Sequence, residues 1–167
     1  MMKTFYRLFW VWEYDKEEQW LNEMAEQGWV LDSYQICRYT FVNCEPGEYI
    51  IRMEMHGGFD PGYIEFMEDT GAELIAKFFG WMYFRRKAEF GEFNIFSDID
   101  SKISHLKGIA NMLMIIGFMN IIIGITNSIL PVHMGFINLL CAALLMYAVG
   151  RIHGKIEALR KERRLHE

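Results

Sequence analysis

Residues 108–150 form a run of 43 residues that contains no Asp, Glu, Lys or Arg. A bilayer core takes about 20 apolar residues in a single helix, so this run is long enough for two membrane-spanning helices and too long for one. The sequence Pro131-Val132-His133 lies near its middle and favours a turn there. The sequence therefore predicts a membrane hairpin with spans over residues 109–130 and 134–152.

Positive charges flank this hairpin at its two ends and are absent from the turn. Two lysines lie close before the first span, and six Lys or Arg residues follow the second. Because cytoplasmic segments carry the excess of Lys and Arg, both termini are expected in the cytoplasm, in a multi-pass protein of the inner (plasma) membrane. Lys107, Arg151 and Lys155 are expected to anchor the hairpin at the lipid headgroups, which makes membrane lipid a predicted partner.

The region before the hairpin is acidic. Residues 1–107 hold 11 Lys or Arg and 19 Asp or Glu, a balance of −8, whereas residues 108–167 hold 6 and 3, a balance of +3. An acidic domain repels phosphate and the basic tail is short, so nucleic acid is not expected as a partner.

The first part of the chain resembles itself after a shift of 43 positions. Gly28 then falls on Gly71 and Phe41 on Phe84, with apolar positions matched between them. Self-similarity at a fixed spacing indicates a duplicated structural unit. Each half reads as a strand, a helix and further strands.

Local signals place the elements of each half. Asp15 and Glu18 have the spacing of a capping box, and Gly28 and Gly71 are suited to end the two helices. The expected elements are a strand at 5–12, a helix at 15–27, strands at 29–33, 36–43 and 48–56, a helix at 61–70, strands at 73–78, 81–86 and 93–96, and a helix from 98 onward. Duplicated β-α-β units with antiparallel hairpins predict a ferredoxin-like α+β fold with an antiparallel sheet. The expected division of the chain is an α+β domain at 1–97, a connecting helix at 98–108, the two-span hairpin at 109–152 and a basic helical tail at 153–167.

Aromatic residues are concentrated before the hairpin. Residues 1–107 contain 23 aromatic residues, against 3 in the remaining 60, and both alternate positions of the expected first strand are apolar. A sheet with one solvent-facing side needs apolar residues on only one of its two faces. A protein partner, a second copy or the membrane surface is therefore expected to cover the second face. The predicted ligand or partner surface consists of Trp10, Trp12, Trp29, Trp81 and Tyr83. These aromatic residues, together with Trp20, either line a pocket for an apolar or cationic ligand or fill a small core.

Other candidate sites have weaker signals. The acidic residues Glu13, Asp15, Glu17 and Glu18 are expected to remain solvated and to favour the helix N-terminus. The glycine-rich stretch from residue 56 to 62 lacks the lysine of a nucleotide-binding loop and reads as a strand-to-helix connection. Cys37, Cys44 and Cys141 show no paired spacing, so free thiols, no metal site and no cofactor are expected. No carboxylate pair has a matching base or nucleophile, so no catalytic residue is assigned.

Small and amide residues recur at helical spacing within the two spans. Small residues let helix backbones approach closely, and Asn can form hydrogen bonds between helices. The residues predicted to pack at this seam, or to dock onto another membrane protein, are Gly117, Asn120, Gly124, Asn127, Asn138 and Ala142.

Several motifs have a pattern found in one protein family. The first half carries Phe9-Trp10-Val11-Trp12-Glu13, the run of residues 17–25 and Gly28-Trp29. The second half carries Gly47-Glu48-Tyr49-Ile50-Ile51-Arg52, Gly80-Trp81-Met82-Tyr83-Phe84-Arg85 and Ile95-Phe96-Ser97-Asp98. Over roughly residues 3–107 the chain resembles the bacterial domain of unknown function 2812 (DUF2812) family. That resemblance implies a membrane-tethered domain, often found beside PadR-type transcriptional regulators in Firmicutes.

These features lead us to expect a membrane-anchored cytoplasmic module that is not an enzyme and that binds a protein partner or senses a ligand. A regulatory role beside a PadR-type repressor is its concrete form. Two alternatives stay open: a small-molecule-binding or enzymatic domain with an aromatic pocket, and an accessory subunit of a membrane transporter complex. The protein partner is expected to be a regulator, a transporter subunit or a second copy of the chain.

Overall fold

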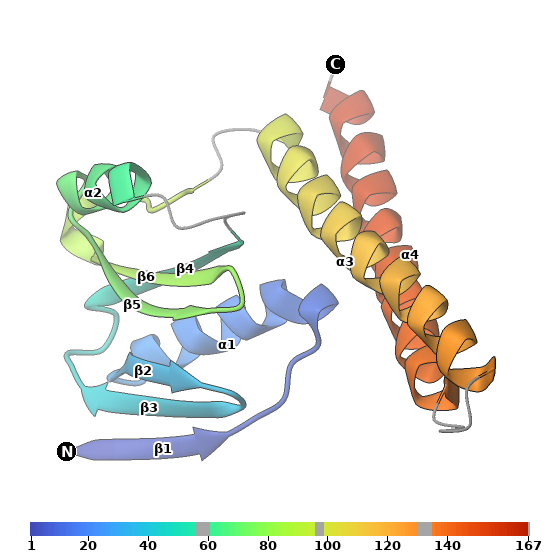
Figure 1. Ribbon diagram of the computed structural model, residues 1–167. Coiled ribbons are helices and arrows are strands. Elements are labelled where there is room, and N and C mark those ends of the chain that lie inside the picture. Colours follow the sequence, from blue (N-terminus) through green and yellow to red (C-terminus); the bar gives the residue numbers. More distant parts are fainter. Residues whose placement is uncertain (56–60, 96–98, 130–134, 167) are drawn as a thin grey trace. The chain divides into compact units, whose positions relative to one another are not determined.

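The N-terminal part of the chain folds as two consecutive β-α-β-β halves, each with its own three-stranded antiparallel sheet (Figure 1). The first half consists of β1 (Met2–Tyr6), a 3-10 turn η1 (Val11–Glu13), α1 (Tyr14–Glu26), β2 (Trp29–Gln35) and β3 (Arg38–Asn43). The second consists of β4 (Tyr49–Met55), α2 (Pro61–Asp69), β5 (Ala72–Phe78), β6 (Trp81–Lys87) and a 3-10 turn η2 (Ala88–Phe90). Two long helices follow, α3 (Ile99–Ile129) and α4 (Gly135–His166).

This computed structural model describes residues 1–55, 61–95, 99–129 and 135–166. It divides the chain into two units, Met1–Ile95 and Phe96–Glu167. The predicted α+β domain followed by a helical hairpin is therefore confirmed in outline.

The predicted duplication is confirmed by the backbone. Positive φ angles of 81° at Gly28 and 83° at Gly71 end the two helices, 43 positions apart. The register shift that follows Leu31 in β2 recurs after Leu74 in β5, again 43 positions later. Both halves therefore share one hairpin, including its irregularity.

The sheet topology differs from the predicted ferredoxin-like arrangement. The strand orders are β1-β3-β2 and β4-β6-β5, so the third strand of each half occupies the centre of its own sheet. With β3 and β6 in these central positions, the described strands pair only within their own half. The structure therefore contains two small sheets where a single ferredoxin-like sheet was expected.

The predicted strand at 5–12 is wrong beyond Tyr6. In the first half, Tyr6 pairs with Arg38. In the second half, the corresponding pair is Met55 with Trp81. Trp81 lies 43 residues after Arg38, but Met55 lies 49 residues after Tyr6. The first half therefore has about six more residues between its first strand and its hairpin. This extra segment runs through a loop and the turn η1, so Trp10 and Trp12 are not strand residues.

Two further boundaries differ from expectation. Residues 91–94 form no strand, although a strand was predicted at 93–96, and Phe93 is instead buried against α2 and β6. The first helix begins at Tyr14 with Glu13 as its N-cap, so Asp15 lies inside the helix. The sequence also favours Asp60 and Asp98 as N-caps of the second and third helices, and both lie outside the described residues.

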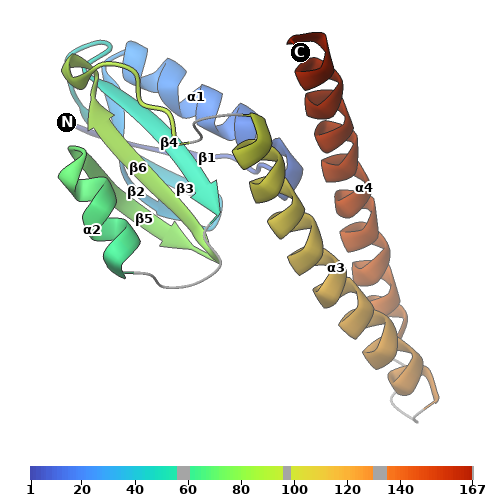
Figure 2. The same ribbon diagram turned by 90° about the horizontal axis from the view of Figure 1, so that it is seen from above.

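Both faces of the central strand β6 are buried. Met82 and Phe84 belong to a cluster with Met67 of α2, while Trp81 and Tyr83 are buried on the opposite face. The helices α1 and α2 lie on opposite sides of this second sheet (Figures 1 and 2). The aromatic excess is thus used largely inside the domain, whereas β1 of the first sheet is exposed along its whole length.

The second unit is an antiparallel pair of long helices that pack along each other (Figure 2). Arg163 near the end of α4 bonds Asp100 at the start of α3, with 2.6 Å between Nη1 and Oδ1. The segments Ile99–Ile129 and Gly135–Arg164 have 31 and 30 residues and are long and apolar enough to cross a membrane. The predicted connecting helix is continuous with the first of them from Ile99 onward.

The seam between α3 and α4 contains glycines whose backbones approach closely. A Cβ atom added at Gly135 would overlap the carbonyl oxygen of Gly124 and the backbone nitrogen of Ser128. The same atom added at Gly150 would meet nothing within 4 Å.

We therefore predict that Gly135→Ala destabilises the helix pair, whereas Gly150→Ala does not. Forcing a methyl group into a closed contact costs about 1–3 kcal/mol, while Ala at the open position favours the helix by up to about 1 kcal/mol. Thermal unfolding in nonionic detergent, followed by far-ultraviolet circular dichroism, measures both variants. Equal midpoints for the two variants would contradict the close packing at Gly135.

Candidate functional site

The carboxylate of Glu17 joins helix α1 to the central strands of both sheets. Its Oε1 atom accepts a hydrogen bond of 2.7 Å from the hydroxyl of Tyr39 in β3 and another of 2.8 Å from the hydroxyl of Tyr83 in β6. Only 7% of the Glu17 surface is exposed, and Tyr39 and Tyr83 are buried. One carboxylate oxygen therefore links the two halves of the domain.

The second oxygen of Glu17 has a different environment. Among the described residues, no donor bonds Oε2 and no Lys or Arg forms an ion pair with it. Oε2 is also not among the fully enclosed polar atoms that lack a partner. Among the described residues, Glu17 thus makes its hydrogen bonds through one oxygen.

Aromatic rings surround the two tyrosines that bind Glu17. The ring of Tyr34 in β2 has its centroid 4.8 Å from those of both Tyr39 and Tyr83. The ring of Trp20 stands edge-on to Tyr39 at 4.9 Å. Aromatic pairs at these separations are attractive and hold rings in fixed orientations. The hydroxyls are thus aimed by rigid side chains from three strands and one helix.

The site changes the acidity of its groups. Burial raises the pKa of the Glu17 carboxyl above its usual value, and the hydrogen bonds from the two tyrosines partly offset this. Burial, followed by the charge of Glu17, raises the pKa of the Tyr39 and Tyr83 hydroxyls. Burial, with the charges of Asp15 and Glu18, raises the pKa of Tyr14 to about 12. Tyr39 and Tyr83 therefore keep their protons at neutral pH and donate hydrogen bonds to Glu17.

Glu17 is the residue that the sequence analysis misplaced. It was expected to remain solvated with its acidic neighbours, but it falls on the buried face of α1 with Tyr14, Leu21 and Met24. Positions three before and four after it are both apolar, which is the spacing of one helix face. That spacing could have identified Glu17, but the adjacent charges of Asp15 and Glu18 obscured it. For the exposed Asp15 the prediction of a solvated side chain is confirmed.

Helix α1 also covers an edge of the second sheet. The side-chain amide of Asn22 donates to the carbonyl of Ile51 at 2.9 Å and accepts from its N–H at 2.9 Å. Glu18 accepts a bond of 2.7 Å from the N–H of Met53. These side chains bind the edge of β4 as a neighbouring strand would, so α1 has a fixed position on the second sheet.

The five aromatic residues predicted as one surface occupy separate environments. Trp10 is 48% exposed and stacks on half-buried Trp12 at 5.1 Å. Trp29 is half-buried beneath the Lys3 ammonium, 3.9 Å from its ring centroid. Trp81 and Tyr83 are buried, and Tyr83 alone of the five binds Glu17.

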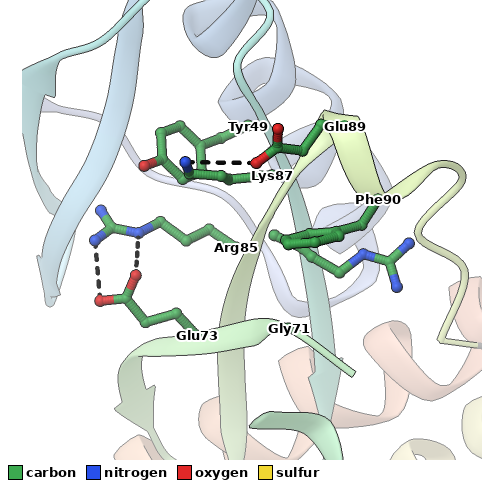
Figure 3. Close-up of a pocket in the computed structure, with 8 residues that line it drawn as sticks. Tyr49, Gly71, Glu73, Arg85, Lys87, Glu89 and Phe90 are labelled. Atoms are coloured by element: carbon green, nitrogen blue, oxygen red, sulfur yellow. Dashed lines mark hydrogen bonds and ion pairs between the residues drawn. The ribbon is translucent and has the colours of Figure 1, made fainter. Parts of the chain in front are cut away.

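A separate open pocket of about 270 Å³ is lined by residues from β4, β5 and β6 of the second sheet and from the turn η2 (Figure 3). Arg85 forms two bonds with Glu73, of 2.8 and 3.0 Å, and Lys87 lies 3.5 Å from Glu89. The ring of Phe90 packs against Gly71 at the pocket floor. Arg85 and Lys87 therefore each have a carboxylate partner, whereas the third cation of the lining, Arg86, bonds the backbone carbonyls of Gly91 and Glu92 at 3.2 and 2.6 Å.

The predicted seam residues lie in or beside the contact between α3 and α4. Gly117, Gly124 and Ala142 are buried, whereas Asn120, Asn127 and Asn138 are half-buried. The Asn120 amide donates to the Ile116 carbonyl of its own helix at 2.9 Å, which supplies a partner without crossing the seam. The predicted anchors Lys107 and Arg151 are exposed and Lys155 is half-buried.

The remaining candidates give no site. Within the described parts of the chain, no group of three His, Cys, Asp or Glu residues is arranged to hold a metal ion. Cys37 and Cys44 are half-buried free thiols, and Cys141 is an exposed one. His56, the adjacent glycines and Asp60 lie outside the described residues.

Comparison with known proteins gives one match. The family model described as "Protein of unknown function (DUF2812)" matches residues 13–118, from the residue before α1 to a point past the middle of α3. No curated protein and no solved structure matches the chain.

We predict that two substitutions of Glu17 have opposite effects on stability at neutral pH. Glu17→Ala leaves two buried hydroxyls without an acceptor, at a cost on the order of 1–3 kcal/mol for each. Glu17→Gln keeps an acceptor oxygen and removes the buried charge. Because the pKa of Glu17 is raised on folding, the folded chain holds more protons and wild-type stability falls as pH rises through the raised pKa. Glu17→Gln has no carboxyl group to ionise, so its stability should not fall over this pH range.

Urea unfolding of the full chain in nonionic detergent measures both effects. All five tryptophans lie in Met1–Ile95, so their fluorescence reports on this unit alone. An alanine variant as stable as wild type would show that the carboxylate does not link the sheets.

Proposed function

The chain belongs to the DUF2812 family, and we propose that it is a membrane-anchored module that senses a ligand and passes the signal to a protein partner. The hairpin is embedded in the inner (plasma) membrane with both termini in the cytoplasm. The module is not an enzyme. The observation that carries this proposal is the buried Glu17 carboxylate, whose bonds reach one central strand in each sheet.

The hairpin supports the anchoring role. Both helices are long enough to span the bilayer, and large apolar side chains such as Ile115, Ile122 and Leu140 are 60% or more exposed. Exposed apolar side chains at this density are stable against lipid and unfavourable in water. The charged residues of α4 gather after residue 150, where the second span ends and its Lys and Arg side chains reach the headgroups.

The Glu17 site supports sensing rather than catalysis. Its two tyrosines hold their protons because their pKa values are raised, so they act as donors of hydrogen bonds and not of protons. A ligand that engages Glu17 competes with or reinforces the bonds that join the two sheets. Such a ligand thereby changes how firmly one half of the domain is held to the other.

The first sheet supplies a surface for a partner. β1 is an edge strand with every residue exposed, and Tyr6 and Leu8 nearby are 77% and 62% exposed. Exposed strand edges with apolar side chains commonly pair with another protein. A PadR-type regulator is the concrete candidate, in keeping with the family neighbourhood.

Reporter fusions test the anchoring. A fluorescent protein that matures only in the cytoplasm should be active at both the N- and C-terminal ends, because the Lys and Arg residues flank both. An enzyme that folds only outside the cytoplasm should be active when inserted in the turn between the helices and inactive at either end. Ends on opposite sides, or a chain recovered free of membranes, would contradict the proposal.

Co-purification tests the signalling role. Tagged full-length protein extracted in mild detergent should recover a PadR-type regulator, identified by mass spectrometry. A double variant, Tyr6→Ser with Leu8→Ser, should lose this regulator because it removes exposed apolar surface beside the edge strand, whereas Ile36→Ser, also on the exposed surface, should retain it. Recovery of nothing but the chain itself would contradict a regulatory role.

A further inference from the structure

One side of the β1 backbone bonds β3, and the other side faces away from the sheet. The N–H of Arg7 donates to the carbonyl of Cys37 at 2.9 Å, in the same register as the pairs of β1 and β3. Hydrogen-bonded and non-bonded pairs alternate along an antiparallel ladder, so Lys3 and Phe5 also direct their N–H and C=O groups at β3. The backbone groups that point outward belong to the alternate residues Met2, Thr4 and Tyr6.

The equivalent groups in the second half of the domain are covered by the chain itself. By the pairing of the two hairpins, Met2 and Thr4 of β1 correspond to Ile51 and Met53 of β4. Side chains of α1 bond the outward N–H and C=O of Ile51 and the N–H of Met53, at 2.7 to 2.9 Å. Within the described parts of the chain, nothing bonds the outward groups of Met2 and Thr4.

The other sheet edges have neighbours. β2 and β5 lie beside each other, and the ring of Tyr34 in β2 meets the ring of Phe78 in β5 edge-on at 5.5 Å (Figure 1). Among the strands that the structure describes, β1 is therefore the one edge without a neighbour, and all five of its residues are exposed. An uncovered edge is a template for pairing with a further strand.

We propose that β1 pairs antiparallel with β1 of a second copy of this chain, with Thr4 of each copy at a two-fold axis. Pairing of a strand with itself about one hydrogen-bonded residue is symmetric, as is usual in dimers. The three-stranded sheets of the two copies then form one continuous sheet. This inference goes beyond the proposed function: it assigns the backbone edge of β1 to a second copy and leaves the exposed side chains of Tyr6 and Leu8 to the regulator.

The strand is complementary to itself in this register. Thr4 exchanges N–H and C=O bonds with Thr4 of the second copy, and Met2 exchanges them with Tyr6, so every outward group finds a partner. The opposed side chains are Thr with Thr, Met with an aromatic ring, and Lys3 with Phe5. Such pairs are favourable across strands, and no like charges stand opposite each other.

The single charge of β1 does not protect the edge. A lysine on an edge strand commonly prevents pairing with another chain. Here the ammonium of Lys3 lies 3.9 Å from the ring centroid of Trp29, so it is held over its own sheet. The edge therefore lacks the device that usually keeps exposed strands apart.

The proposed anchoring in the membrane favours a second copy over a strand of an unrelated protein. Copies held in one membrane with the same orientation are confined to a thin layer, which raises their effective concentration for each other. A contact between two strands of five residues is weak in dilute solution and gains most from such confinement.

Cysteine cross-linking in isolated membranes tests the register. The chain used has its three native cysteines replaced by serine. Thr4→Cys should form disulfide-linked dimers on oxidation with copper phenanthroline, because its Cα atom lies about 5.5 Å from the same atom of the second copy. Tyr6→Cys is the matched control on the same side of β1 and should stay monomeric, because its Cα atoms are offset by about 13 Å along the strands.

A second pair of variants tests the backbone bonds. Thr4→Pro removes an N–H that faces away from β3, so the domain tolerates it, and it should weaken the dimer by about 10-fold or more. Thr4→Val keeps this N–H and should leave the dimer unchanged. Light scattering of the full chain in nonionic detergent, over a range of protein concentrations, measures the dimer, and tryptophan fluorescence confirms that both variants are folded. If Thr4→Pro does not fold, the cross-linking pair decides.

Four results would overturn the proposal: no Thr4→Cys dimer, equal cross-linking of Thr4→Cys and Tyr6→Cys, dimers of Thr4→Pro as tight as those of Thr4→Val, or Thr4→Cys linked only to another protein. None of these measurements requires the regulator or the reporter fusions. Their failure is therefore distinguishable from failure of the proposed function.

Discussion

One buried carboxylate reaches the central strands of both halves of the N-terminal unit, beside the bonds that Asn22 and Glu18 of the same helix make to β4. Glu17 lies on one helix, and its Oε1 atom accepts bonds from the central strands of both sheets. An apolar core of the same volume would avoid the cost of burying a charge, so such a group is not explained by stability alone. Its cost is justified where the charge fixes a unique arrangement, and the two bonds at Glu17 do so by reaching both sheets.

The Glu17 cluster occurs once in the duplicated domain, because its tyrosines have no equivalents in the other half. The residue 43 positions after Tyr39 is Met82, and the residue 43 positions before Tyr83 is Thr40. The helices differ as well, since α1 has 13 residues and contacts both sheets, whereas α2 has 9 and packs on its own sheet. Two similar backbones thus carry one asymmetric polar connection.

The sequence was informative where a local rule decides the structure. The glycines at 28 and 71, the hairpin at 78–81 and the uncharged run each follow from short-range chemistry, and the structure has all of them. The strand at 5–12 was misjudged because apolar and aromatic residues continue past Tyr6, where β1 ends, into a loop. The burial of Glu17 was readable from the apolar residues Tyr14 and Leu21 on the same helix face. The separate sheets, the strand order and the bond from Tyr83 to Glu17 depend on contacts between residues far apart in the chain, and no local pattern encodes them.

The two units satisfy burial by different physical means, and this explains their opposite compositions. In water, large rings gain most from leaving the solvent, and the first unit is accordingly filled with aromatic pairs such as Trp20 and Tyr39. Two helices that pack together in lipid gain no comparable hydrophobic free energy, so a pair of membrane helices is stabilised by close approach of the backbones. The glycine contacts of α3 and α4 provide that approach, with bulky residues directed outward. The buried carboxylate of Glu17 accordingly lies in the aromatic unit, among the rings of Tyr34, Tyr39 and Tyr83.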